Sequence, residues 1–173
     1  MGIITRPEKV KLIIGLISSD EDLLIKTGSS LEKALRNKID YASPVMDFNY
    51  TDYYKKEMGP LLKRKFLSFE KNIDLRGICR IKVLTNRLEA RSAKDNKRVI
   101  NIDPGYLDMA KLVLFSTKDY THRIYLDQGI FAEVTLYYQN DTFNPWPWTY
   151  PDYKSKEYIS IFNHIRGIYK KGA

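Results

Sequence analysis

Residues 10–18, VKLIIGLIS, form a nearly continuous apolar run of strand length. A strand with one exposed face alternates between apolar and polar residues, so this run predicts a central strand that is buried on both faces. Ser18, Ser19 and Asp20 follow as candidate helix caps, and apolar residues then recur at helical spacing. The sequence therefore predicts a helix over about residues 20–38, directly after the buried strand.

Two further strands and a second helix are predicted in the next part of the chain. Residues 43–50, SPVMDFNY, alternate in the manner of a strand, and residues 61–71, LLKRKFLSFEK, mix apolar and polar side chains on both faces. We expect the second of these strands in an outer position of the sheet because of its mixed faces. Asp74 is the predicted cap of a helix over residues 75–92, with an apolar stripe on one side and arginines on the other.

The second half of the chain predicts more strands. Residues 98–107, RVINIDPGYL, are expected to form a strand that ends in an Asp-Pro-Gly turn. Residues 108–118 are compatible with a strand or a helix. Residues 122–126 and 130–138 are predicted as two strands, and Asp-Gln-Gly at 127–129 is the tight turn between them.

An irregular arm over residues 139–154 and a final helix over residues 155–170 complete the chain. The order of elements predicts an α+β fold with a ferredoxin-like β-α-β-β-α-β core, extra antiparallel strands and a C-terminal helix. Its 173 residues are the size of one domain, so residues 1–173 are expected to form a single domain.

Composition excludes several classes of protein. A lone cysteine, Cys79, can form neither an internal disulfide nor a cysteine-based zinc site. No stretch approaches the roughly 20 apolar residues of a membrane span, and the start of the chain has no signal-peptide pattern. We therefore expect a cytoplasmic protein without a membrane partner.

Positive charge is concentrated in one segment. Residues 55–98 hold fourteen Lys and Arg against five Asp and Glu, a net charge of +9, whereas the whole chain has +8. Within the predicted helix 75–92 the arginines are Arg76, Arg80, Arg87 and Arg91. A local basic field attracts polyanions such as RNA, and the alternative is a solvated face that keeps the protein soluble.

Polar residues also cluster within strands that are otherwise built for burial. Glu133 and Thr135 share one face of the predicted strand 130–138 with Phe131 and Tyr137. This face is typical of a pocket wall, and the alternative is an ordinary solvent face of an antiparallel sheet.

Five side chains of this region are candidates for phosphate or metal chemistry. Lys118, His122 and Arg123 are potential hydrogen-bond donors to a phosphate. Lys118, Arg123 and Thr135 are candidate ligand-binding residues. Asp103 and Glu133 are candidate ligands of Mg²⁺. Asp103, His122 and Glu133 are also the candidate catalytic residues. The same residues are compatible with a structural ion-pair network.

Aromatic residues gather at 146–153, WPWTYPDY. One interpretation is an arm that lies across an apolar surface and holds the terminal helix in place. The other is a stacking platform for nucleic acid bases.

Several motifs resemble a known family. NIDPGY at 101–106, LVLFSTKDYTHRIYL at 112–126, GIFAEVTL at 129–136 and PWTYPDY at 147–153 are similar to an uncharacterised prokaryotic family, domain of unknown function 4416. DYYKKEMG and FLSFEK, earlier in the chain, also fit its pattern. The resemblance spans nearly the whole chain and implies no activity, ligand or fold.

Three functional hypotheses remain open at this stage. The first is recognition of a phosphate-bearing ligand, RNA or a nucleotide, through the basic surface and a polar pocket, with Arg76, Arg80 and Arg87 among the contacts. The second is a metal-dependent enzyme that acts on a phosphorylated or nucleotide-like small molecule, with Mg²⁺ as the metal. The third is an interaction protein without ligand chemistry.

Overall fold

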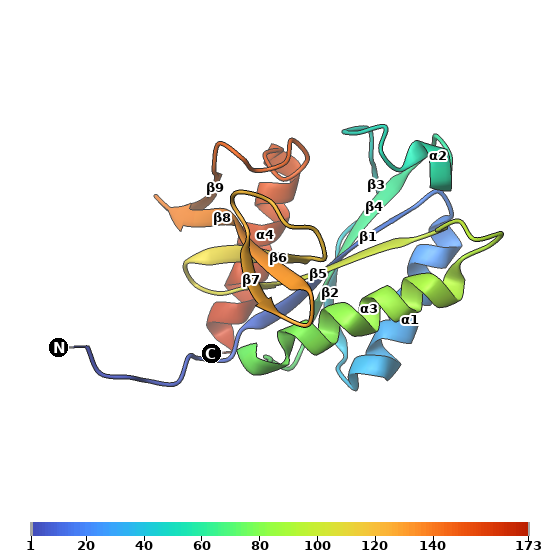
Figure 1. Cartoon of the computed structure of the whole chain (residues 1–173). Coiled ribbons are helices and arrows are strands. Elements are labelled where there is room, and N and C mark those ends of the chain that lie inside the picture. Colours follow the sequence, from blue (N-terminus) through green and yellow to red (C-terminus); the bar gives the residue numbers. More distant parts are fainter. Residues whose placement is uncertain (1, 173) are drawn as a thin grey trace.

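A nine-stranded antiparallel sheet organises the computed structural model, which describes residues 2–172 (Figure 1). The strands are β1 (Lys11–Ser18), β2 (Ile39–Ala42), β3 (Met46–Asp47), β4 (Lys63–Phe69), β5 (Asn101–Leu107), β6 (Lys111–Ser116), β7 (Ile124–Asp127), β8 (Ile130–Gln139) and β9 (Thr142–Pro145). The helices are α1 (Glu21–Leu35), α2 (Lys55–Met58), α3 (Ile78–Ser92) and α4 (Lys156–Lys171), and a short 3-10 turn, Leu75–Gly77, precedes α3. The α+β class, the large antiparallel sheet and the C-terminal helix are confirmed.

The sheet runs in the order β2-β4-β1-β5-β6-β8-β7, with β3 beside β4 and β9 beside β8. Every residue of β1 is buried, as the apolar run predicts, because β4 and β5 flank it and helices cover both of its faces. Leu12, Ile14 and Leu16 pack on the side of α1, and Ile13 packs on the side of α4. Each such side chain contributes about 1.5–3 kcal/mol of hydrophobic stabilisation.

The first helix and the strand after it differ in length from the prediction. Asp20 caps α1 by accepting the Leu23 amide at 3.0 Å, and Arg36 ends the helix in the left-handed conformation. The predicted strand 43–50 begins earlier, as β2, and is interrupted at Ser43 and Pro44 before β3. Proline has no amide hydrogen for a sheet, which explains the interruption.

The expected outer position of the strand in 61–71 is wrong, because β4 lies between β2 and β1. Two of its polar side chains, Arg64 and Ser68, are buried with partners, whereas Lys63 and Lys65 are partly exposed. Arg64 forms an ion pair with Asp152, and Ser68 donates a hydrogen bond to Asp40 at 2.5 Å. Mixed faces here indicate buried polar pairs, which a sequence pattern does not distinguish from exposed ones.

The Asp-Pro-Gly turn predicted at 103–105 is also wrong, because these residues lie in the middle of β5 and pair with β1. The actual turn follows at Asp108, whose side chain accepts the amides of Ala110 and Lys111 at 2.8 Å. Gly105 is needed for close approach, since a Cβ there would lie 2.4 Å from the Val113 carbonyl oxygen of β6. Residues 108–118 contain the strand β6 and no helix.

Two hairpins follow β6. The β7–β8 hairpin has its predicted turn, with Gln128 and Gly129 at positive φ. The first part of the segment predicted as irregular is β9, which pairs with β8. Asn140 and Asp141 both have positive φ, the requirement of a type I′ turn, and this turn chemistry was the missed signal.

The sheet divides between β5 and β6. These two strands pair only from Gly105 to Leu107, opposite Leu112 to Leu114. Before Gly105, β5 stays with β1, and after Leu114, β6 stays with β8, so the two strands diverge. Figure 1 shows α3 lying along the same region, beside α1. The divergence leaves a space between the two parts of the sheet, and the candidate site lies in it.

No helix within residues 2–172 combines the length and the apolar character that crossing a membrane requires.

Candidate functional site

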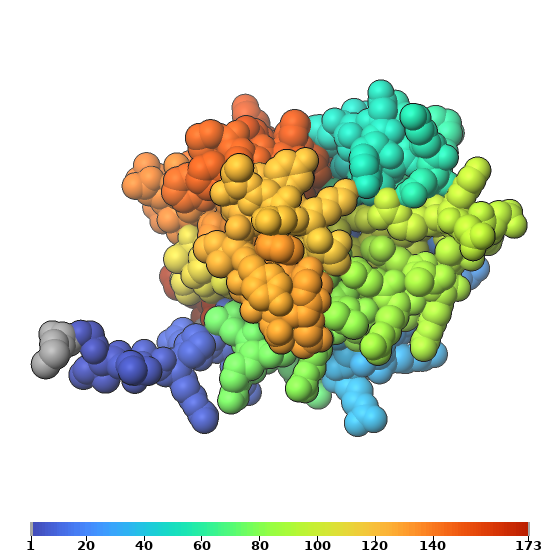
Figure 2. Space-filling model, in the orientation of Figure 1, coloured from blue at the N-terminus to red at the C-terminus, as the bar shows by residue number. Residues whose placement is uncertain are grey.

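A cleft of about 420 Å³ opens where β5 and β6 diverge. Its walls are the diverging ends of these strands, the segment 51–54 before α2, and the arm residues 150–153, while α3 side chains line its depth. In Figure 2 the surface is hollowed where the segment near residue 120 faces residues 50–60. Pockets for small molecules have volumes of about 300–1,000 Å³, so the cleft has a suitable size.

Charged side chains of both signs line the cleft. The cations are Arg64, Lys82, Arg98, Lys118 and Arg123, and the acids are Glu89, Asp103, Glu133 and Asp152. The fold thus gathers four residues that were predicted from sequence, Asp103, Lys118, Arg123 and Glu133, around one space.

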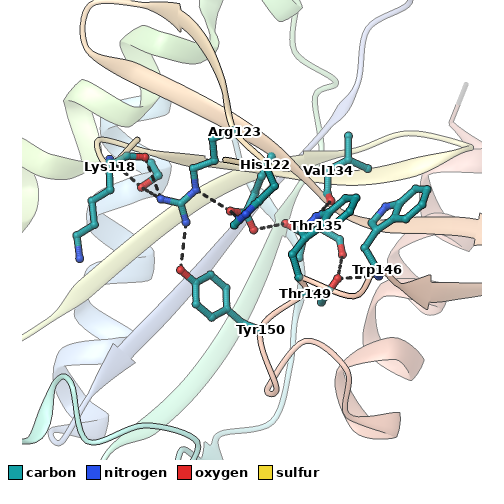
Figure 3. Close-up of polar contacts among 11 residues, drawn as sticks. Lys118, His122, Arg123, Val134, Thr135, Trp146, Thr149 and Tyr150 are labelled. Atoms are coloured by element: carbon teal, nitrogen blue, oxygen red, sulfur yellow. Dashed lines mark hydrogen bonds and ion pairs between the residues drawn. The ribbon is translucent and has the colours of Figure 1, made fainter. Parts of the chain in front are cut away.

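Arg123 and Glu133 form a buried ion pair in the cleft (Figure 3). Arg123 Nε donates to Glu133 Oε2 at 2.7 Å, and both side chains are at most 5% exposed. The remaining nitrogens of Arg123 donate to Ser116 Oγ, the Lys118 carbonyl and the Tyr150 hydroxyl. Because every nitrogen of this guanidinium has an acceptor, Arg123 joins the β6–β7 connection to the arm.

Lys118 has a different environment, at the rim of the cleft. Its Nζ donates to the Tyr53 hydroxyl at 2.8 Å and lies 4.3 Å from the centre of that ring. This hydrogen bond lowers the pKa of Tyr53. Within residues 2–172 no carboxylate pairs with Lys118, and Figure 3 shows its amine directed away from Arg123 and His122.

Arg64 lies at the base of the cleft inside an aromatic cage. Its guanidinium is buried, donates to Asp152 at 2.9 Å and lies 4.9 Å from the centre of the Phe48 ring. Nε and Nη1 of Arg64 have no hydrogen-bond partner within residues 2–172. Gly15 of β1 leaves room for this side chain, because a Cβ there would stand 2.8 Å from Nη1. Burial raises the pKa of Asp152, and the Arg64 charge opposes that shift.

A stripe of polar residues on α3 faces the cleft through the gap between the strands. Lys82, Asn86 and Glu89 follow one another at helical spacing and all line the cleft. Lys82 Nζ donates to the Ile102 carbonyl at 3.3 Å and lies 3.6 Å from Asp103 Oδ1. The backbone of Ile102 also donates its amide to Glu89 Oε1.

The Glu89 carboxyl has an altered acidity. Burial raises the pKa of Glu89 to about 7, although the Ile102 amide and the Lys82 ammonium oppose the shift. This stripe was not predicted from the sequence, because α3 was expected to have one apolar and one basic side. The signal was present, since the spacing of 82, 86 and 89 is that of a single helix face.

The model of a family described as Domain of unknown function (DUF4416) matches residues 8–169. The chain belongs to this family. The match includes every residue that lines the cleft and confirms the resemblance inferred from the motifs. No curated protein and no solved structure matches the chain.

The other predicted site residues of this DUF4416 member lie outside the cleft. His122 Nε2 is 3.2 Å from Glu133 Oε2, and its ring stacks on Trp148. Thr135 is fully buried and donates to Glu133 Oε1 at 3.3 Å. Both residues therefore contact the Glu133 carboxylate without lining the cleft themselves.

The arginines of α3 are separate from the cleft. Arg80 and Arg87 are exposed on the outer side of the helix, as is Arg91. Arg76, in the turn before α3, is exposed and forms an ion pair with Asp74 at 2.6 Å. The basic side predicted from the sequence is thus present on the surface of the helix.

The candidate metal ligands are occupied by protein groups. Asp103 accepts the Asn101 amide group at 2.5 Å, and Glu133 is held by Arg123. Within residues 2–172 no three His, Cys, Asp or Glu side chains are arranged to hold a metal. A Mg²⁺ ion between Asp103 and Glu133 stays a prediction.

The tryptophans of the arm are packed against β8 rather than presented as free surfaces. Trp146 and Trp148 stack on each other at 5.1 Å, and His122 stacks on Trp148. Thr149 Oγ1 donates to the Thr135 carbonyl at 2.6 Å. These contacts occupy ring faces and hold the arm at the wall of the cleft, as Figure 3 shows.

Proposed function

We propose that the cleft binds a small phosphate-bearing molecule of nucleotide size. The observation that carries the proposal is an imbalance of hydrogen-bond partners among its charged groups. Each of the four cleft carboxylates accepts a hydrogen bond from a donor group of the protein. In contrast, Lys118 pairs with no carboxylate and Arg64 leaves two nitrogens unpartnered within residues 2–172. Unused donors favour a ligand that brings acceptor oxygens, and phosphate brings several.

The aromatic lining supports a ligand with a flat ring beside the phosphate. The tyrosines at the cleft are Tyr53, Tyr54, Tyr120, Tyr150 and Tyr153. Tyr53, Tyr120 and Tyr150 are exposed. A base that stacks on such a ring gains about 1–3 kcal/mol. A nucleotide combines both features in a molecule that a cleft of this volume can hold.

Isothermal titration with adenosine monophosphate (AMP), pyrophosphate and adenosine tests this proposal. We expect AMP and pyrophosphate to bind and adenosine, which has no phosphate, to bind far more weakly. Lys118→Gln removes one exposed cation from the rim and should weaken AMP binding about tenfold, the cost of one charged hydrogen bond. Lys26→Gln, an exposed lysine on α1, is the matched control and should bind AMP as the wild type does. Equal AMP affinity in wild type and Lys118→Gln would contradict a contact between the phosphate and Lys118.

A second candidate function is RNA binding by the outer side of α3. The exposed Arg80, Arg87 and Arg91 support it, because none of them forms an ion pair within residues 2–172. Contacts of this kind add affinity without base specificity and weaken as salt rises. For either function, we expect a cytoplasmic protein.

We also infer a ferredoxin-like core. Its support is the order β2-β4-β1-β5, with α1 between β1 and β2 and α3 between β4 and β5. In this interpretation the cleft lies where the added strands, beginning with β6, leave the core.

A further inference from the structure

The two oxygens of Glu89 have different surroundings. Oε1 accepts the Ile102 amide, so the carboxyl is fixed to β5, the wall of the cleft. Oε2 has no hydrogen-bond partner within residues 2–172, and the residue lines the cleft. A carboxyl that is anchored through one oxygen and leaves the other for the ligand has the arrangement that proton transfer requires.

We propose that Glu89 is the proton-transfer residue of the cleft, exchanging a proton with the phosphate-bearing molecule bound there. This inference rests on the proposed function, since it needs a ligand in the cleft. It adds acid–base chemistry to binding, and it assigns that chemistry to a side chain of α3 rather than to Glu133, whose carboxyl is already held by Arg123 and His122.

The exchange moves one proton and no other atom. When Glu89 acts as the acid, the O–H bond of its carboxyl breaks and the proton bonds to a basic oxygen or nitrogen of the ligand. The carboxylate that remains keeps the Ile102 amide and is stabilised by the Lys82 ammonium. In the reverse direction the ligand loses its proton to Glu89 Oε2.

The acidity of Glu89 matches that of the proposed ligand class. Burial raises the pKa of Glu89 to about 7, so both of its forms are populated at neutral pH. Phosphate monoesters lose their second proton near pH 6, so exchange between the two groups is nearly balanced. The other charged groups that act on Glu89 lie on β5, on α3 and in the connection between them. Asp103 raises its pKa, whereas Lys82 and Arg98 lower it.

Carbon-13 NMR of the glutamate carboxyls and titration calorimetry with AMP together test the inference on the full chain. In the NMR titration we expect one carboxyl signal with a midpoint near pH 7 that is missing from Glu89→Gln. Gln at 89 keeps an oxygen for the Ile102 amide, so a purely structural role would survive this change. In calorimetry at pH 7, repeated in buffers of different ionisation heat, AMP binding should exchange a different number of protons in wild type and in Glu89→Gln. Glu70→Gln changes an exposed residue that does not line the cleft, and this variant should behave as the wild type.

The outcomes separate the two proposals. A Glu89 midpoint near the ordinary value of about 4.3, or equal proton exchange in both proteins while AMP binds, overturns the inference and leaves the proposed function standing. Failure of AMP and pyrophosphate to bind the wild type contradicts the proposed function and the inference with it.

Discussion

The two sides of α3 carry similar numbers of polar residues in opposite environments. On the outer side Arg80, Arg87 and Arg91 extend into solvent, and on the inner side Lys82 and Glu89 face the cleft. A hydrated charge costs the fold almost nothing, so its presence requires no specific purpose. A charge withdrawn from water costs free energy unless it is paired, so its presence calls for an explanation. The comparison teaches that positive charge in the sequence is a weaker guide to function than the burial of a few polar groups.

We expect the largest loss of stability when the buried charge of Glu133 is removed. In Glu133→Gln, the buried guanidinium of Arg123 loses its counter-ion, and the unfolding free energy should fall by about 3 kcal/mol. Urea unfolding measures this change, with Arg87→Gln as an exposed control that should stay within about 0.5 kcal/mol of the wild type. A loss below about 1 kcal/mol for Glu133→Gln would mean that the inner charges are as dispensable as the outer ones.

Glu89 should give a smaller effect that depends on pH. Its pKa is raised from about 4.3 when unfolded to about 7 when folded, so it favours folding below pH 4 and this contribution is lost as pH rises through 7. Glu89→Gln lacks this dependence. Between pH 4 and pH 8 the wild type should therefore lose about 2 kcal/mol of stability relative to Glu89→Gln, less than the full pKa shift implies because Glu89 is partly exposed. Unfolding curves at both pH values provide the measurement, and a constant difference would show that Glu89 titrates in its ordinary range.

Gly15 sharpens the comparison at the base of the cleft. In Gly15→Ala the new methyl group would stand 2.8 Å from Arg64 Nη1 and 3.2 Å from the Phe66 ring, and overpacking of this kind costs about 1–2 kcal/mol. Gly28→Ala on α1 is the matched control, because its nearest contact, at 3.4 Å, is the end of the Ile39 side chain. Alanine favours a helix by up to about 1 kcal/mol over glycine, so the control should not be destabilised. Equal stability of the two variants would contradict the close packing of Arg64 on β1.

The smallest effect on stability is expected on the outer side of α3. Changing Arg80, Arg87 and Arg91 together to Gln should alter the unfolding free energy by less than about 1 kcal/mol. If this side binds RNA, the triple variant should bind it more weakly and with a shallower salt dependence than the wild type. Filter binding over a salt series measures both quantities. Wild-type protein that binds no RNA at low salt would exclude the second candidate function.

Local patterns explain which parts were predictable from sequence. The burial of β1 follows from its own residues, and the β7–β8 turn follows from Gln128 and Gly129. The Arg123–Glu133 pair could be predicted in outline, because a hairpin fixes the spacing of residues ten positions apart.

Contacts between distant segments explain what was not predicted. Arg64 and Asp152 are 88 positions apart, and their pairing depends on how the arm packs against β4. Asp103-Pro104-Gly105 has the composition of a turn, but pairing with β1 overrides that local preference. The cleft itself arises from the divergence of β5 and β6, a feature of the whole sheet that no single strand encodes.

The most direct test of ligand binding in the cleft is a titration of nitrogen-15-labelled protein with AMP, followed through the backbone amide signals. We predict that the amide signals of Arg80, Arg87 and Arg91 stay in place and that the shifted signals come from residues that line the cleft, namely Asn101, Asp103, Ser116, Thr117, Lys118, Tyr150, Asp152 and Tyr153. Shifts confined to the outer side of α3, or no shifts at millimolar AMP, would contradict the claim that the cleft is the binding site.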